Sequence, residues 1–159
     1  LGAEKVALSF SALHNISLCQ EIGSIIGNQS VVVVLDVKKK KLFGGYEIYT
    51  HNGTKKSKWK LDDFITKLEE INVGEIVINS IDNDGTMQGY DQNLVEIVRE
   101  KCSMPITVLG GASGLDDVRK LINKFKIIGA AAGSLFVFKG KYRAVLINYP
   151  NREERKSLY

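Results

Sequence analysis

Short apolar runs that alternate with helical patterns are the feature that most constrains the fold of this chain. Strand-like runs lie at residues 5–10, 31–37, 75–81, 106–109 and 127–132, and most are continuously apolar rather than alternating. Continuous apolarity indicates strands buried on both faces, which is typical of a parallel sheet. Helical patterns lie between the runs. The chain is therefore predicted to form five successive strand–helix units, the last with a short helix.

The helices are predicted from apolar spacing and from caps. Asn15 and Asp91 can each cap a helix, and Asn52-Gly53 between alternating residues predicts a β-ribbon over the carboxyl face of the sheet. The expected inward-facing or helix-patterned apolar residues are Ile16, Leu18, Ile22 and Ile25, then Leu61, Phe64, Ile65, Leu68 and Ile71, then Leu94, Val95 and Val98, and finally Leu115, Val118, Leu121, Ile122 and Phe125.

Five units do not close an eight-stranded barrel, and an open doubly wound sheet lacks support because no glycine-rich loop follows the first strand. The predicted fold class is α/β: a (βα)8 TIM barrel of which this chain supplies about five C-terminal βα units. Residues 1–159 are expected to form a single domain, the C-terminal part of such a barrel. About three units would then precede Leu1, which is not a Met.

Composition excludes several classes of protein. The chain has 159 residues, 44% of them apolar and 25% charged, with no apolar run long enough for a membrane span and no leader, so a cytoplasmic protein without a membrane partner is expected.

Cys19 and Cys102 form no CxxC pair and fall in helix-like segments, which indicates buried thiols in a reducing compartment. His14 and His51 have no neighbours at metal spacing. The net charge of +4 comes from lysines at 38–41 and 55–60, which either solvate a loop or steer an anion; no nucleic-acid motif accompanies them.

A polar loop follows the third strand-like run. Asp82 and Asp84, then Gly85 and Thr86, place carboxylates, N–H groups and a hydroxyl at one strand end, where a polyhydroxylated or phosphorylated ligand can bind. A calcium loop is disfavoured, because a strand leads into the segment and Asp replaces Glu at its last ligand position.

Two further strand ends carry chemistry. Asp36 ends the second run and is a candidate general acid or base if that apolar strand raises its pKa, with an ion pair to Lys38 as the alternative. Gly110-Gly111 and Gly133-Ser134 follow the last two runs, where backbone N–H groups form anion sites. In a barrel these would be the phosphate-gripping loops after strands seven and eight; glycine turns required only for packing are the alternative.

These motifs together resemble the HisF family, the cyclase subunits of imidazole glycerol phosphate synthase, over nearly the whole chain. The matching motifs are Leu1-Gly-Ala-Glu-Lys-Val, the strand ending in Asp36, Gly74-Glu-Ile, Ser80-Ile-Asp-x-Asp-Gly-Thr-x-x-Gly-Tyr-Asp91, Pro105-Ile, Gly110-Gly111 and Ala132-Gly-Ser134. The resemblance implies an ammonia-using barrel lyase of histidine biosynthesis. Such a lyase converts a bis-phosphorylated aminoimidazole carboxamide ribonucleotide into imidazole glycerol phosphate and AICAR.

The resemblance also implies roles for residues of this chain. Asp36 matches one of two catalytic aspartates, and Lys5 and Glu75 match members of a charged gate for ammonia. The residues expected to bind the phosphorylated small-molecule substrate are Ser9, Asn79, Asp84, Gly85, Thr86, Gly110, Gly111, Gly133 and Ser134. A HisH-like glutaminase is the implied partner, and no cofactor, metal or nucleic acid is expected. Without the resemblance, Lys5 and Glu75 would read as a stabilising ion pair at the opposite end of the sheet.

Some residues depart from the family pattern. Ser9-Phe10 stands where Asn-Thr is usual, Leu109 replaces a Ser, and the family's other catalytic aspartate belongs to a first strand that this chain does not include. Residues 41–53 and 142–150 look more like HisF paralogues of surface-polysaccharide (lipopolysaccharide) clusters, which are thought to pass ammonia onto a nucleotide-linked acetamido sugar. A half-barrel that binds phosphate or a partner without catalysis is the third alternative, and its open strand edges predict self-association.

Overall fold

Parallel strands form the centre of the computed structural model, which describes residues 2–42, 44–140 and 142–158. Within these residues seven strands form one sheet. Five are mutually parallel: β1 (Val6–Leu8), β2 (Val31–Lys39), β5 (Glu75–Ser80), β6 (Ile106–Leu109) and β7 (Gly129–Ala130). Strands β3 (Tyr46–Thr50) and β4 (Lys55–Lys56) add an antiparallel ribbon to the carboxyl-terminal part of β2. The predicted ribbon is confirmed, with Asn52 and Gly53 at positive φ in its turn.

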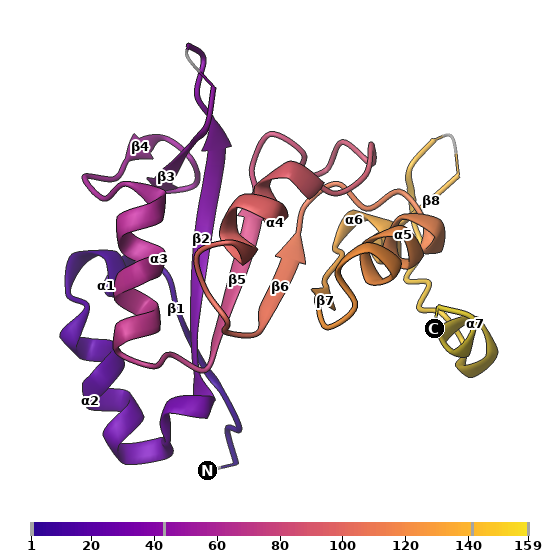
Figure 1. Ribbon diagram of the computed structural model, residues 1–159. Helices are drawn as coiled ribbons and strands as arrows, with labels where there is room; N and C mark the ends of the chain where they lie inside the picture. Colours follow the sequence, from indigo (N-terminus) through magenta and orange to yellow (C-terminus); the bar gives the residue numbers. More distant parts are fainter. Residues whose placement is uncertain (1, 43, 141, 159) are drawn as a thin grey trace.

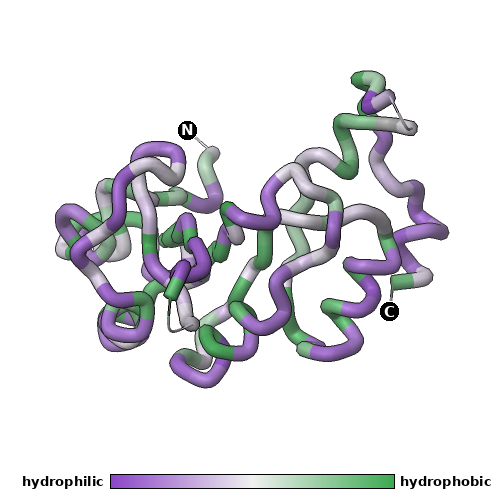
Figure 2. The backbone as a smooth tube through the Cα atoms, turned by 90° about the horizontal axis from the view of Figure 1, so that it is seen from above, coloured by the Kyte–Doolittle hydropathy of each residue, from purple (hydrophilic) through white to green (hydrophobic). Residues whose placement is uncertain are grey.

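Helices connect the parallel strands (Figure 1). They are α1 (Phe10–His14), α2 (Ser17–Ile26), η1 (Asn28–Ser30), α3 (Leu61–Glu70), α4 (Gln92–Arg99), α5 (Leu115–Phe125) and α6 (Ser134–Val137), followed by the small hairpin of β8 (Phe138–Lys139) and β9 (Ala144–Val145) and by α7 (Arg152–Lys156). Along the helices, hydrophobic stretches alternate with hydrophilic ones, as expected for helices that cover a sheet on one side (Figure 2). None of the described helices is long and apolar enough to cross a membrane.

The core lies between one face of the sheet and the helices. Fully buried side chains on that face include Val33, Leu35, Ile76, Ile78 and Ile106. They pack in one cluster with apolar residues of the helices, namely Phe64, Ile65 and Leu68 of α3, Leu94, Val95 and Val98 of α4, and Leu121 of α5. Burial of this apolar surface is the main driving force for docking the helices onto the strands.

The opposite face of the sheet is only partly covered. Registers align Val34 with Val77 and Thr107, and Asp36 with Asn79 and Leu109, and all of these are half-buried. The prediction of burial on both faces holds at the start of β2 but is wrong for β5 and β6, where burial alternates. In a closed barrel this second face lines the interior.

Several predicted boundaries need correction. The first strand ends at Leu8 because the chain turns into α1 at Phe10, and the last predicted strand is reduced to β7. The N-cap position of α2 is Ile16 rather than the predicted Asn15, although the Asn15 side chain accepts a hydrogen bond from the Ser17 backbone N–H at 3.2 Å. Asp91 caps α4 as predicted by accepting from Leu94 N–H. Ile25 is 81% exposed, so it is not a core residue.

Cys102 lies in the loop after α4 rather than in a helix. The thiols of Cys19 and Cys102 are buried and unpaired, and burial raises the pKa of each.

Candidate functional site

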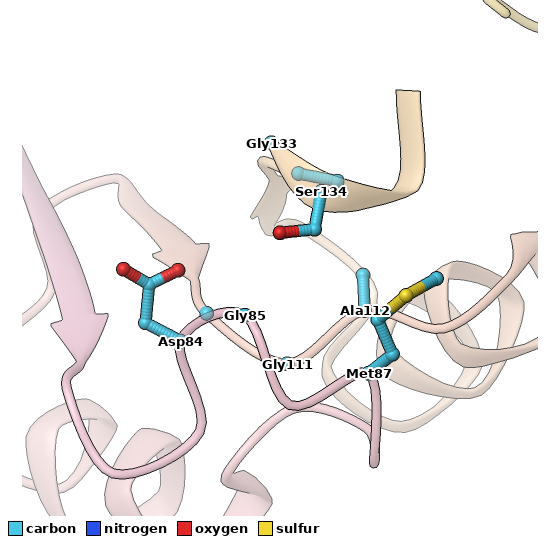
Figure 3. A pocket seen from close by; sticks show the side chains of 9 residues that line it. Asp84, Gly85, Met87, Gly111, Ala112, Gly133 and Ser134 are labelled. Atoms are coloured by element: carbon cyan, nitrogen blue, oxygen red, sulfur yellow. The ribbon is translucent and has the colours of Figure 1, made fainter. Parts of the chain in front are cut away.

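Most of the predicted site residues line one of two pockets at the carboxyl ends of the parallel strands. The first, here called the glycine pocket, is formed by the loops after β5, β6 and β7. It is lined by Asp84, Gly85, Met87, Gly110, Gly111, Ala112, Ala132, Gly133 and Ser134. Figure 3 shows the Ser134 hydroxyl extending toward the Asp84–Gly85 side of this pocket. Six of the predicted binding residues therefore meet in one place.

Two of the glycines are required by close contact between loops. Gly110 and Gly111 have φ of +96° and +102°, and a Cβ on Gly111 would lie 2.1 Å from the Gly89 carbonyl oxygen. The Gly89 N–H donates to the Gly111 carbonyl at 2.7 Å, so the loops after β5 and β6 touch backbone to backbone. A side chain fits neither this conformation nor this space. The packing explanation for these two glycines is therefore sound, and it is compatible with a ligand on their other side.

Gly133 differs from this pair. Its φ is −105°, and a Cβ built there would meet no atom within 4 Å. The fold thus places no steric demand on residue 133, which borders the pocket directly. Space kept open beside Ser134 leaves room for a ligand to approach the backbone.

Tyr90 ties the loop after β5 to the segment after β7. Its hydroxyl donates to the Ala131 carbonyl at 3.0 Å. Burial, together with the negative charge of Asp117, raises the pKa of Tyr90 to about 12, so the phenol remains a donor at any physiological pH. Asp117 accepts from both the backbone N–H and the hydroxyl of Ser113, which lowers its pKa and fixes the loop before α5.

The two loop aspartates, expected together at a ligand-binding strand end, do not share a role. Asp82 accepts a hydrogen bond from the Lys39 backbone N–H at 2.7 Å and thereby anchors its loop to the end of β2. Asp84 alone lines the glycine pocket. Thr86 was predicted to bind the ligand but is exposed outside the pocket lining, and its hydroxyl donates to the Asn83 carbonyl. Neither the contact of Asp82 with the end of β2 nor the local turn that satisfies Thr86 was visible in the residue pattern.

Asp36 lies in a second pocket, here called the hairpin pocket, which is lined by Ser9, Phe10, Asp36, Thr50, His51 and Asn52. The Asn79 side-chain amide donates to the Asp36 carboxylate at 2.9 Å, so the predicted binding residue Asn79 also orients the predicted catalytic one. The alternative ion pair with Lys38 is not formed; Lys38 Nζ lies 5.7 Å from the centre of the Tyr49 ring. Sequence reasoning missed Phe10, Thr50 and His51, although the predicted ribbon over the carboxyl face was a signal for the last two.

Lys5 and Glu75 lie at the opposite end of the sheet. Lys5 Nζ is 2.5 Å from Glu75 Oε2, and the Thr107 hydroxyl donates to Glu75 Oε1 at 2.6 Å. Burial opposes ionisation of Glu75, but the hydrogen bonds from Lys5 and Thr107 outweigh it and lower the pKa of this carboxyl. The ion pair expected at this end is therefore present.

Among the described residues, no group of three or more His, Cys, Asp or Glu is arranged to hold a metal.

The fold and its strand-end loops define the class of protein. Consecutive parallel βα units with polar loops at the strand ends are the architecture of a TIM barrel, present here in part. A family model described as "Histidine biosynthesis protein" matches residues 1–143, and the chain belongs to that family.

Curated relatives point the same way. The chain is 48% identical over 158 residues to a provisionally named imidazole glycerol phosphate synthase subunit HisF of Leptospira borgpetersenii, covering 99% of this chain and 62% of the relative. A similarly named protein of Leptospira interrogans is 47% identical over 99% of this chain and 62% of the relative. The imidazole glycerol phosphate synthase subunit HisF of Chlorobaculum tepidum is 33% identical over 87% of this chain and 54% of the relative. The chain thus spans about three fifths of the length of its nearer relatives.

Proposed function

We propose that this chain is the carboxyl-terminal part of a single-domain barrel that condenses ammonia with a phosphorylated substrate, in the manner of the cyclase subunit of imidazole glycerol phosphate synthase. The product pair would be imidazole glycerol phosphate and AICAR. The observation that carries this proposal is the convergence of three strand-end loops on the glycine pocket, with Gly133, Ser134 and Asp84 facing a small polar space. The names of the relatives support it.

Most of the predicted residues have a role in this proposal. Backbone N–H groups near Gly110, Gly111 and Gly133, with the Ser134 hydroxyl, would hold a phosphate, because such groups bind anions without a cationic side chain. Asp36 would be the general acid or base, held by Asn79. Ser9 lies beside Asp36 in the hairpin pocket and would contact the same substrate. The relatives extend beyond the region matched here, and a second catalytic carboxylate is proposed to lie in that additional length.

The ammonia source is part of the proposal. A HisH-like glutaminase would dock at the amino-terminal end of the strands, where Lys5 and Glu75 form their ion pair. Glu75→Gln in the full-length polypeptide is then expected to impair glutamine-dependent turnover more than ammonia-dependent turnover. Steady-state rates with each nitrogen source measure this difference, and equal losses with both would remove Glu75 from ammonia passage.

Asp36→Asn tests the chemistry. The exchange keeps the size and the contact with Asn79 but removes the carboxylate, so ammonia-dependent turnover by the full-length polypeptide should fall by about 10²–10⁴-fold. Substrate affinity, measured by calorimetry, should stay within a few-fold because the phosphate contacts lie in the glycine pocket. Asp82→Asn is the matched control. It makes the same exchange at a carboxylate that lines neither pocket, and the new side-chain oxygen can still accept from the Lys39 N–H, so turnover should be kept. Turnover unchanged in Asp36→Asn would exclude Asp36 from the reaction.

A further inference from the structure

The hairpin pocket contains two candidate bases, and they come from different elements. Asp36 stands near the end of β2, and His51 follows β3 in the turn of the ribbon. Both side chains line the same pocket with Ser9 and Phe10. No role is assigned to His51 by the site described above. A carboxylate and an imidazole that share one pocket are a frequent arrangement for proton transfer.

Hydrogen bonds at the base of the turn favour one tautomer of the His51 imidazole. His51 Nδ1 lies 3.0 Å from Thr50 Oγ1, and the Thr50 hydroxyl donates its only proton to the Lys55 carbonyl at 3.2 Å. Both contacts are satisfied together only if Nδ1–H is the donor to Thr50 Oγ1. Neutral His51 then has its lone pair on Nε2. No hydrogen bond to Nε2 is formed within residues 2–42, 44–140 and 142–158.

Backbone and packing hold the imidazole in this place. His51 has φ of +52°, in the left-handed region that non-glycine residues rarely adopt, and the Thr54 N–H donates to the His51 carbonyl to close the turn. The Phe10 ring lies against the imidazole edge to face, with centroids 5.0 Å apart. Thr50 is buried, so the hydroxyl that contacts Nδ1 is shielded from solvent. Unusual backbone conformations that the surroundings maintain are concentrated at functional sites.

We infer that His51 is a catalytic residue of the hairpin pocket, whose Nε2 accepts a proton from the attacking nitrogen beside Asp36, with Thr50 as the positioning residue that fixes the tautomer. The inference rests on the proposed function, with a substrate carbonyl carbon as the atom that ammonia attacks. The nitrogen lone pair forms the C–N bond as the C=O π electrons move onto oxygen, and one N–H proton passes to Nε2 and then to that oxygen, which gives the carbinolamine. Nε2 then takes a second N–H proton and delivers it to the hydroxyl, which leaves as water while the C=N bond forms, so His51 ends neutral.

The tautomer is tested without any turnover. Full-length polypeptide labelled with ¹⁵N at histidine is expected to show a protonated Nδ1 and an unprotonated Nε2 for His51, assigned by its loss in His51→Asn. Thr50→Ser should keep this pattern, while Thr50→Val should abolish it, because valine has no acceptor for Nδ1–H. A protonated Nε2 in the neutral wild-type side chain would overturn the inference.

Turnover tests the role of Nε2. His51→Asn keeps a donor near the Nδ1 position, and asparagine tolerates positive φ, but it has no group at Nε2. Ammonia-dependent turnover is expected to fall about 100-fold and to recover in part with added imidazole. The matched control is His14→Asn, since His14 stacks on Phe10 but does not line the pocket. The control should keep turnover within about twofold, without an imidazole effect, because it removes no base.

Outcomes of this experiment separate the inference from the function on which it rests. Full turnover in His51→Asn, with Asp36→Asn inactive, would overturn the role of His51 and leave the proposed function intact. A loss in His51→Asn that imidazole does not restore, with the tautomer of wild type unprotonated at Nδ1, would likewise overturn it. Absence of ammonia-dependent turnover in wild type would instead contradict the proposed function itself.

Discussion

At the scale of single residues, the glycines around the glycine pocket differ in what the fold demands of them. Gly111 touches the Gly89 carbonyl and has positive φ, whereas Gly133 has ordinary φ and open space around it. The same residue type therefore serves loop packing at one position and leaves room beside Ser134 at the other. A sequence pattern cannot separate these cases, because both glycines follow a strand.

Gly111→Ala and Gly133→Ala form a matched pair for this distinction. Gly111→Ala should lower the free energy of unfolding by about 1–3 kcal/mol, because the new Cβ is both strained and in contact with the Gly89 carbonyl. Gly133→Ala should change it by less than about 0.5 kcal/mol. Urea unfolding followed by circular dichroism measures both. Equal midpoints for the two variants would contradict the packing argument.

Glu75 gives a prediction about pH. Its folded-state pKa is lowered below 4.5, so its contribution to stability is fully present above the unfolded value and is lost as pH falls through the folded value. The stability difference between wild type and Glu75→Gln should therefore be largest at neutral pH and should shrink below about pH 4.5. Chemical unfolding at pH 7 and at pH 3.5 measures it. If the stability difference between wild type and Glu75→Gln instead grew as the pH falls, the lowered pKa of Glu75 would be contradicted.

At the scale of elements, a polar cluster around the buried Asp91 joins the end of β2, the start of β3 and the start of α4. The Asp91 side chain is 3% exposed, accepts from the Tyr46 hydroxyl at 2.9 Å and lies 3.1 Å from Lys39 Nζ. It also caps α4. The hydrogen bond to Asp91 raises the pKa of Lys39, and burial raises that of Tyr46. This cluster supports the loops that form both pockets.

Asp91→Ala should therefore destabilise the chain by about 1–3 kcal/mol, because it removes a helix cap and leaves the Tyr46 hydroxyl without its acceptor. Asp116→Ala is the matched control, since the Asp116 side chain is 80% exposed and pairs with Arg119 on the surface. The control should cost no more than about 1 kcal/mol. Guanidinium unfolding compares the two, and similar costs would contradict the role given to the cluster.

Elements with strong periodicity were predictable and elements fixed by tertiary contacts were not. Asp91 as a cap, the ribbon around Asn52-Gly53 and the strand at 106–109 follow from local patterns and are confirmed. Helix α1 and the shortness of β7 had no signal in the residue pattern, and the position of Asp82 depends on a contact with the distant Lys39. The candidate site was predictable as a set of strand-end loops. Its division into two pockets, with Asn79 oriented toward Asp36, required the strand registers.

At the scale of the whole molecule, the sheet has strand edges that are not paired with another described strand. Among the described strands β1 pairs only with β2 and β7 only with β6, so each has a free edge. Large apolar side chains are also exposed around the β8–β9 hairpin, namely Tyr142, Val145, Leu146, Ile147 and Tyr149. Free edges and exposed apolar side chains favour association between copies.

Residues 1–159 alone are accordingly expected to self-associate. Sedimentation velocity over a hundredfold range of concentration should show the weight-average mass rising with concentration. Ile147→Lys, at a side chain that is 83% exposed, should reduce the association if the hairpin patch contributes and leave it unchanged if the strand edges alone do. A monodisperse monomer throughout the range would contradict this prediction.

The central claim, ammonia-dependent condensation at the strand-end pockets, is tested most directly by one turnover measurement. The full-length polypeptide is supplied with ammonia and, in parallel, with the histidine-pathway ribonucleotide and with a nucleotide-linked acetamido sugar. The account predicts conversion of the ribonucleotide. Conversion of the sugar alone would assign the chain to the polysaccharide paralogues, and conversion of neither would contradict the account and leave a binding module.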